Sequence, residues 1–348
     1  MGWKDRPRWV TPVLNFAVSL VLGVGFTWLA MRDVDFDKVG EILETVEYWY
    51  VWPYVGLMVL VHLLRTWRWG LLLSPIAHVP FKRLLPISSV GFLAIVLLPF
   101  RMGEFVRPYL VADHGKLTFS AALATCVVER IVDALLVLGM LFAALATVET
   151  PIPPSVITSG YVALAAFGGL LGVILIALWK RDASIAFWEK LIGLVSRKLA
   201  QRMTAMLAAF IDGLHALRSG KRMVLLLLSS LAYWGLAGFG LYLLFQAFHL
   251  DLPFSATFIV NGILVVGIMV PGGPGFTGPF EIALKVALVD LFLLPESVNA
   301  SYTIVLHALQ FGFQLIVGVI FLFSSHVSFV KLVDASGRAA SSLRTEEG

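Results

Sequence analysis

Charged residues that could bind an anion gather in and around one short segment of an apolar region, LPFRMGEFVRP at residues 98–108. Charge in such a region is costly, so these residues usually face a partner or a transport pathway. The candidates, with those of the neighbouring apolar stretches, are Arg65, Arg68, Arg101, Glu104, Arg107, Glu129, Arg130 and Asp133. Five Arg against three acids leave a surplus of two positive charges. Because a guanidinium binds phosphate bidentately and keeps its proton, the pattern predicts a site for a phosphate-bearing head group.

Two of these arginines have an alternative interpretation. Arg65 and Arg68 are three residues apart and share a helix face, with Trp67 and Trp69 beside them. Arg and Trp also anchor helices at a membrane surface, where the guanidinium reaches into water. The sequence leaves both roles open for this pair.

A second segment, PGGPGFTGPFE at residues 271–281, is broken by Gly and Pro in the same way but carries less charge. Glu281 and Lys285 are four residues apart in the order that favours a local ion pair. His307 and Gln310, with Gln314, form a polar stripe that either lines a site or joins helices. The seven His are scattered, so we expect no metal site, and the absence of a P-loop motif predicts no bound nucleotide cofactor.

The composition predicts that most of this chain lies in a lipid bilayer. Hydrophobic residues make up 59% of the 348 residues and charged residues 14%, and the mean hydropathy is +0.89. These values exclude a soluble domain and predict an all-α integral membrane protein. Since a bilayer core of about 30 Å needs roughly 20 apolar residues per helix, we predict six full spans. They lie near residues 10–31, 51–73, 120–148, 157–179, 222–248 and 300–324.

The placement of Lys and Arg predicts the orientation, because these residues accumulate in cytoplasmic connections. The N-terminal KDRPR and the connection 180–222 are basic, whereas the connection 32–50 is mostly acidic. We therefore expect both termini in the cytoplasm of a bacterial or archaeal cell, with the chain in the plasma membrane. Residues 183–217 alternate apolar and basic side chains at helical spacing and predict an amphipathic helix, or a helix pair, on the cytoplasmic face.

Two apolar stretches remain without a full crossing in this topology. Residues 84–118 connect two predicted spans whose adjoining ends both lie on the cytoplasmic side. Residues 254–290 connect two predicted spans whose adjoining ends both lie on the outer side. Each should enter the membrane and return as a helical hairpin, and the two should enter from opposite faces. The predicted architecture is an inverted repeat with halves at 51–148 and 222–324, within one domain of residues 1–325 that precedes a polar tail at 326–348. The alternative is that each stretch crosses twice, which gives ten helices.

The sequence also resembles a known family. The run LPFRMGEFVRPYLV, the following VVERIVDALLVLG and the later PGGPGFTGPFEIAL are similar to motifs in the transmembrane region of lysylphosphatidylglycerol synthases, a family with stand-alone, flippase-like members. In the fused members this region is associated with translocating an aminoacylated lipid that a cytosolic synthase domain makes. Only the tail follows the last span here, so we expect that domain to be absent. By motif, the resemblance places the polar core at Arg101, Gly103, Glu104, Arg107, Glu129, Arg130, Asp133, Gly275 and Glu281.

These observations favour a flippase for a phospholipid, glycolipid or polyprenyl-linked precursor. The predicted substrate site adds Arg65, Arg68, Lys285, His307 and Gln310 to that polar core. Arg101 and Arg107 would hold the phosphate. The alternatives are an intramembrane glycosyl- or aminoacyl-transferase, with Glu104, Glu129 or Asp133 as general base, and an accessory scaffold for a lipid-modifying enzyme. A membrane lipid is the expected partner, a lipid-modifying enzyme is a second one, and no nucleic acid is expected.

Overall fold

A computed structural model describes residues 10–98, 103–112, 117–147, 152, 154–194, 196–215 and 219–324, and these residues form helices without β-strands. In chain order the α-helices are α1 Val10–Met31, α2 Phe36–Thr45, α3 Val51–Leu73, α4 Phe81–Leu97, α5 Val106–Ala112, α6 Phe119–Leu145, α7 Pro154–Trp179, α8 Arg181–Gly193, α9 Arg197–His215, α10 Gly220–Ala247, α11 Phe254–Gly267, α12 Pro279–Lys285 and α13 Glu296–Ser324. Short 3-10 turns lie at Tyr48–Tyr50 (η2) and Pro274–Phe276 (η5), and a π-helical turn lies at Val286–Leu291 (η6).

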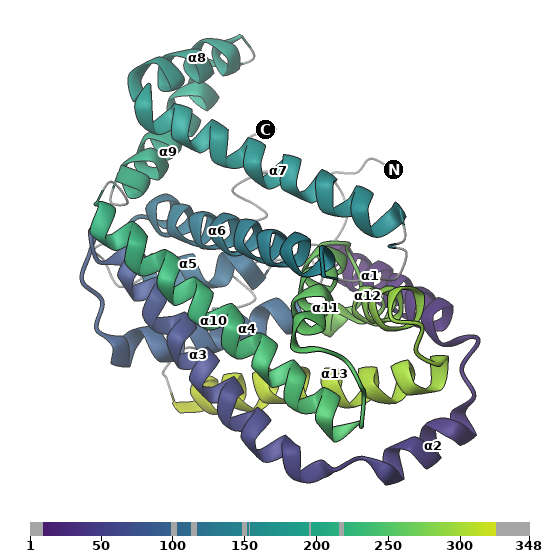
Figure 1. Ribbon diagram of the computed structural model, residues 1–348. Helices are drawn as coiled ribbons and strands as arrows, with labels where there is room; N and C mark the ends of the chain where they lie inside the picture. Colours follow the sequence, from purple (N-terminus) through teal and green to yellow (C-terminus); the bar gives the residue numbers. More distant parts are fainter. Residues whose placement is uncertain are drawn as a thin grey trace.

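Each of the six predicted spans coincides with one helix of 22 to 29 residues, namely α1, α3, α6, α7, α10 and α13 (Figure 1). By length and composition alone, four of these helices are apolar enough to cross a membrane, and a fifth span results if α1 and α2, which meet at 82°, are counted together. The long helix α6 is not among the four, and it carries three charged residues in its middle, Glu129, Arg130 and Asp133. The chain is therefore an all-α polytopic membrane protein.

The two remaining apolar stretches form hairpins with unequal arms. The first has α4, of 17 residues, and α5, of 7; the second has α11, of 14, and α12, of 7, which continues into η6. At 1.5 Å per residue a seven-residue helix rises about 10 Å, far less than a bilayer core of about 30 Å. The described returning arms are shorter than a full span, which favours two hairpins over the alternative of ten full spans.

The helices pack reciprocally between the two halves. α3 packs along α10, which Figure 1 shows as two long neighbouring helices, while α4 packs on α13 and α11 packs on α6. The first arm of each hairpin thus packs on the last long helix of the other half. This exchange is what an approximate twofold relation between inverted halves produces.

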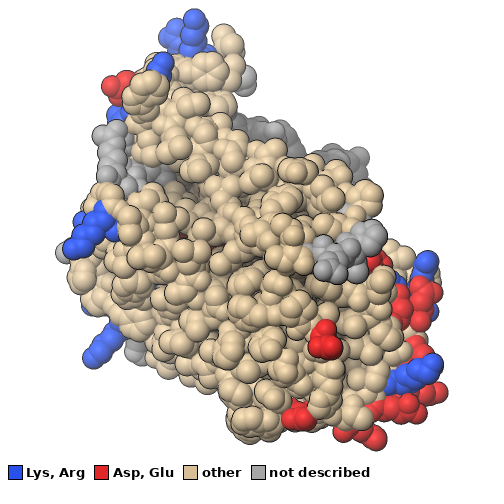
Figure 2. Space-filling model, viewed as in Figure 1, with Lys and Arg blue, Asp and Glu red and all other residues tan. Residues whose placement is uncertain are grey.

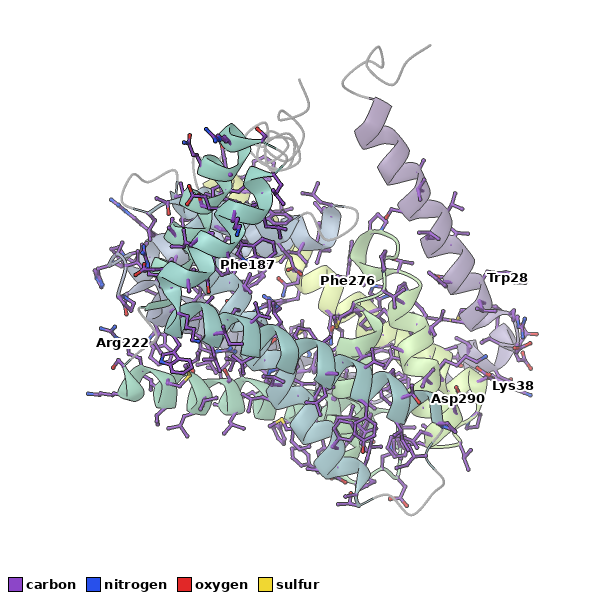
Figure 3. The ribbon with its side chains drawn as sticks, turned by 90° about the horizontal axis from the view of Figure 1, so that it is seen from above. Trp28, Lys38, Phe187, Arg222, Phe276 and Asp290 are labelled. Carbon is purple, nitrogen blue, oxygen red and sulfur yellow. The ribbon has the colours of Figure 1, made fainter. Side chains whose placement is uncertain are left out.

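The tips of the hairpins meet inside the molecule. A small cavity of about 140 Å³ lies between Ile95 and Leu98 at the end of α4 and the residues from Met269 to Phe276 of the second hairpin. Figure 3 shows Phe276 of this second tip between Arg222 at one end of the molecule and Lys38 and Asp290 at the other. Within the second tip Gly275 and Gly278 are buried, whereas Met269, Val270 and Pro271 are exposed. The carbonyl groups of Gly272 and Gly275 accept hydrogen bonds from Ser19 and His307, as irregular backbone in a membrane requires.

Glycine permits close approach in both reciprocal helix pairs. A Cβ atom added at Gly318 of α13 would lie 2.4 Å from the Cβ atom of Leu93 in α4, and one added at Gly262 of α11 would lie 2.7 Å from that of Leu141 in α6. Small residues at such contacts are the main way in which membrane helices pack tightly. The two glycines therefore set the distance between the halves.

We expect Gly318→Ala to destabilise the protein by about 1–3 kcal/mol, because the new methyl group overpacks the contact between α13 and α4. Gly312→Ala is the matched control on the same helix, since nothing lies within 4 Å of its added Cβ. This control should be neutral or stabilising by about 0.5–1 kcal/mol, the helix preference of Ala over Gly. Thermal unfolding in detergent measures both, and equal melting temperatures would contradict the assigned contact.

Charge divides between the two ends of the molecule. In Figure 2, Lys and Arg gather around α8, α9 and the start of α10, Asp and Glu gather mainly near α2, and an uncharged surface lies between them. The acidic connection 32–50 contains a helix that the sequence analysis did not anticipate. Asp35 caps α2 by accepting hydrogen bonds from the N–H groups of Asp37 and Lys38. The bonds and charge that Lys38 supplies lower the pKa of the Asp35 carboxyl.

The predicted amphipathic segment 183–217 is a pair of helices, α8 and α9. α9 packs on α6 and buries Ala200 and Ile211, whereas α8 has no buried residue and exposes Phe187 and Trp188. The two helices project from the basic end of the molecule (Figure 1). α9 thus packs against the body although it exposes Met203 and Met206, whereas α8 has no buried side chain.

Candidate functional site

A cavity of about 550 Å³ lies between the two halves. In the first half α3, α4 and α6 line it, and in the second half α10, α11, α13 and the second hairpin loop do. Apolar and aromatic side chains form most of the surface, as in pockets that bind organic ligands. The predicted site residues that line it are Arg65, Glu104, Arg130, Asp133, Gly275, His307 and Gln310.

Arg65 and Arg130 are the arginines that reach this cavity. Their side chains are 16% and 30% exposed. Each shares the carboxylate of Glu129, at 3.8 Å from Arg65 Nε and at 3.9 Å from Arg130 Nη2. These separations exceed hydrogen-bond length, so the guanidinium groups keep N–H donors for a further anion.

Glu129 is the centre of the charge network. It has no exposed surface, and its second carboxylate oxygen accepts a hydrogen bond of 3.1 Å from Arg107 Nη2. Three arginines from three helices therefore surround one buried carboxylate. The predicted helix face of α6 is correct, because Glu129 and Asp133 both point into this network.

Asp133 neutralises a separate arginine. Arg68 is fully buried and donates to Asp133 at 2.5 Å, with its guanidinium 5.1 Å from the centre of the Tyr233 ring. Arg65 and Arg68 are both inside the protein, so the interpretation of this pair as surface anchors is wrong. Trp67 is 41% exposed, as an anchor would be, but Trp69 is fully buried.

Aromatic rings complete the network, and the sequence analysis missed their role. Phe92 lies between two arginines, with its ring centre 3.8 Å from the Arg65 guanidinium and 4.7 Å from that of Arg107. Trp69 lies 4.3 Å from the Arg107 guanidinium and donates its indole N–H to Thr125. Cation–π contacts of this kind are strongest where water is excluded. No spacing in the sequence indicates them, because the rings come from α3 and α4 and serve an arginine on α5.

Arg107 consequently has a different position from the predicted one. Its side chain is 2% exposed and does not line the cavity. It holds the network together, and the arginines available to a head group are Arg65 and Arg130. Arg101, the other arginine predicted to hold phosphate, lies outside the described residues.

Gly103 allows the first hairpin to close. A Cβ atom there would lie 2.1 Å from the backbone of Ala94 and Ile95 in α4, so no larger residue fits. Gly91 is equally close to Arg107, with 2.1 Å between an added Cβ and the Arg107 Cγ atom. Gly91 therefore leaves room for the buried Arg107, while Gly103 lets the returning chain lie close to α4 and does not line the cavity.

The facing wall contains a pair that the sequence did not predict. His307 lies 2.7 Å from a Glu281 carboxylate oxygen through Nδ1 and 2.9 Å from the Gly275 carbonyl oxygen through Nε2. Lys285 does not pair with Glu281. It pairs with Glu296 at 2.6 Å and with Asp33 at 3.7 Å, outside the cavity. Gln310 donates to the Tyr54 hydroxyl at 3.4 Å, which joins α13 to α3.

Among the described residues, no group of three His, Cys, Asp or Glu side chains is placed to hold a metal ion. The guanidinium groups of Arg65 and Arg130 face a polar stripe across a mostly apolar cavity. Guanidinium groups in such a place are chemically suited to bind a phosphate.

Comparisons with known proteins agree with this architecture. A family model described as the lysylphosphatidylglycerol synthase TM region matches residues 16–318. Two relatives from Methanothermobacter thermautotrophicus, both called UPF0104 membrane protein, are 23% and 24% identical; they cover 78% and 91% of this chain and 83% and 98% of their own lengths. No solved structure matches the chain significantly. The chain therefore belongs to the family of the lysylphosphatidylglycerol synthase TM region.

Proposed function

We propose that this protein carries a lipid with a phosphate-bearing head group from one leaflet of the membrane to the other. The observation that carries the proposal is the cavity between the halves, with Arg65 and Arg130 on one wall and apolar side chains over most of the rest. Its volume of about 550 Å³ lies within the range of about 300–1,000 Å³ for pockets that hold small ligands. A head group fits in such a space while the acyl chains stay in the bilayer.

The charge of the described network supports an anionic ligand. Arg65, Arg68, Arg107 and Arg130 oppose Glu104, Glu129 and Asp133, which leaves one positive charge. Buried charge without a partner is costly in a membrane. A phosphate between Arg65 and Arg130 would supply the missing negative charge.

The predicted orientation belongs to the same proposal. The basic end of the molecule, with α8 and α9, would face the cytoplasm, and the acidic end with α2 would face outward. The first hairpin would then enter from the cytoplasm and the second from outside. A separate enzyme that makes or modifies the lipid would be a partner of this carrier.

The test is lipid exposure in proteoliposomes. Fluorescent phosphatidylglycerol is incorporated into both leaflets, and the fraction that an added membrane-impermeant reductant bleaches over time gives the rate of exchange. We expect the wild-type protein to accelerate exchange of this lipid. The double variant Arg65→Gln/Arg130→Gln should exchange the lipid at least about tenfold more slowly than the wild type, because charge-assisted hydrogen bonds to the phosphate are removed.

Arg83→Gln is the matched control, because Arg83 is an exposed arginine at the start of α4 and lies outside the cavity. It should exchange the lipid at the wild-type rate. A fluorescent glucosylceramide, which has no phosphate, should move more slowly than phosphatidylglycerol and should not respond to the double variant. Equal rates for wild type and double variant would exclude the assigned site. A new covalent lipid product would favour the transferase alternative.

A further inference from the structure

The second hairpin contains a hydrogen-bond arrangement that cannot exist without an added proton. The imidazole of His307 lies between two groups that accept hydrogen bonds, the carboxylate of Glu281 at 2.7 Å and the carbonyl oxygen of Gly275 at 2.9 Å. A neutral imidazole has one N–H donor and one acceptor nitrogen. It can therefore donate to only one of these two groups.

The other Glu281 oxygen does not relieve this conflict. It accepts the backbone N–H of Gly278 at 2.5 Å, so it serves as an acceptor as well. Both contacts of His307 are satisfied in two cases: the imidazole is protonated and the carboxylate ionised, or the imidazole is neutral and Glu281 carries the proton toward Nδ1. Both cases hold the same single proton. The pair with this proton is neutral, and without it the pair is negative and one hydrogen bond is lost.

The hydrogen bonds at stake hold the irregular loop of the second hairpin. Gly275 and Gly278 have φ angles of +72° and +99°, and Phe276 has a φ of +64°, so this backbone is outside the region that most residues prefer. Within the loop, Gly273 N–H donates to the Thr277 carbonyl at 2.9 Å and the Thr277 hydroxyl donates to the Pro274 carbonyl at 2.6 Å. From α1, the Ser19 hydroxyl donates to the Gly272 carbonyl at 2.7 Å. The bonds from His307 and Glu281 attach the loop to α13 and to the start of α12.

The loop also separates the large cavity from the first hairpin. Phe276 lines both the large cavity and the small cavity between the hairpin tips. A change at His307 would thus be transmitted directly to the wall that separates the two. His307 itself lines the large cavity and its side chain is 18% exposed, so water in the cavity can deliver or remove a proton.

The charge of the Glu281–His307 pair depends mainly on whether this proton is bound. The Phe280 ring stacks on the imidazole at 4.4 Å and the Phe311 ring lies edge-on at 6.2 Å. Among the described residues, no Lys or Arg forms an ion pair with Glu281 or His307, because Lys285 is engaged by Glu296 and Asp33. From α3, the Tyr54 hydroxyl reaches these surroundings by accepting a hydrogen bond from Gln310. The other ionisable side chains on the cavity wall are His62, Arg65, Glu104, Arg130, Asp133 and Tyr233.

We infer that Glu281 and His307 form a proton-binding site that holds the second hairpin loop in place when occupied and releases it when the proton leaves. This site would make the proton the coupling ion of the carrier, and to that extent the inference rests on the proposed function. Binding of the proton forms one N–H···O bond, and its departure breaks either the bond to Gly275 or the bond to Glu281. Because the ionised carboxylate is the stronger acceptor, the neutral imidazole keeps its bond to Glu281 and loses the bond to Gly275 that attaches the loop to α13.

The loop can be observed without any lipid transport. Amide hydrogen exchange of residues 268–281 in nanodiscs gives protection factors, which are corrected for the intrinsic pH dependence of exchange. In the wild-type protein we expect protection of this segment to fall about tenfold between about pH 5 and pH 9, as one hydrogen bond to a charged group is lost. No such change is expected in α10.

Glu281→Gln is the decisive variant. Its amide N–H can donate to Nδ1 of a neutral His307, Nε2–H can still donate to Gly275, and the amide oxygen can accept from Gly278. Every hydrogen bond is then made without the extra proton, so the loop should be protected at both pH values. His307→Gln should leave the loop weakly protected throughout. His62→Gln replaces a His on the opposite cavity wall that contacts Ser89, and it should keep the wild-type pH dependence.

Protection that does not vary with pH in the wild-type protein would overturn the inference. So would a pH dependence in Glu281→Gln equal to that of the wild type. The lipid-exchange assay under an imposed pH gradient is read separately. If loop protection behaves as expected while phosphatidylglycerol does not move, the proton site stands and the proposed transport function fails.

Discussion

Replacing Glu129 by Gln should destabilise the protein by about 3–5 kcal/mol, because the change removes the shared negative charge from a group of buried arginines. Glu129 has no exposed surface, and Arg107, which donates to it at 3.1 Å, is 2% exposed. The substituted amide keeps the size of the side chain, so the loss measures charge and not packing. Thermal or denaturant unfolding in detergent gives the magnitude.

Two further variants identify the cause. Glu189→Gln makes the same chemical change on the exposed surface of α8 and should stay within about 0.5 kcal/mol of wild type. Adding Arg107→Met to Glu129→Gln removes the buried charge that has lost its partner, and it should recover part of the stability. A double variant as unstable as the sum of its single changes would show that the network is not electrostatic.

The second large effect concerns Arg68 and Asp133, which form a separate buried pair at 2.5 Å. Arg68→Met or Asp133→Leu alone should cost about 3–5 kcal/mol, since each leaves an opposite charge inside the protein. The double variant should be much less destabilised than the two single variants combined, because no unpaired charge remains. The double-mutant cycle measures this coupling by unfolding.

Both members of this pair must be buried for the expected coupling to appear. Arg68 is fully buried and the Asp133 side chain is 7% exposed. Additive effects of the two changes would mean that water reaches the pair and screens it, as in a surface ion pair worth about 0.2–1 kcal/mol. The coupling energy thus measures how dry the interior of the network is.

The six long helices could be predicted from the sequence because apolar length is a direct requirement of the bilayer. The hairpins followed from the topology, since residues 84–118 and 254–290 each connect ends on the same side. α2 was missed although its signal was present: Asp35 is a typical N-cap residue, and Phe36, Val39 and Leu43 follow at helical spacing. The acidic composition of this segment concealed a short amphipathic helix.

The residue types of the site could be predicted, but their assignment to roles could not. Arg107 was expected to hold the phosphate but is buried outside the cavity lining, whereas Arg65 reaches the cavity. Which arginine is exposed depends on how α5 and α3 are rotated about their axes, and these rotations are set by packing between distant segments. Glycine contacts such as Gly91 against Arg107 determine that packing and leave no periodic signal.

Local spacing was misleading in the second half. Glu281 and Lys285 satisfy the rule for an ion pair within a helix, which is worth about 0.2–0.5 kcal/mol. Tertiary partners are stronger than this weak preference, so Lys285 binds Glu296 and Asp33 while Glu281 binds His307. His307 was recognised as part of a polar stripe, yet its partner lies 26 residues away along the chain.

The attachment of α1 has a consequence for biosynthesis. The Ser19 hydroxyl donates to the Gly272 carbonyl at 2.7 Å, and these residues are 253 positions apart. At about 5–20 residues per second, a ribosome adds the second hairpin loop roughly 10–50 s after it has made α1. During that interval α1 must remain in the bilayer as an independent helix. Its contact surface, with Gly23 against Gly273, is therefore completed only after the second hairpin loop has been made.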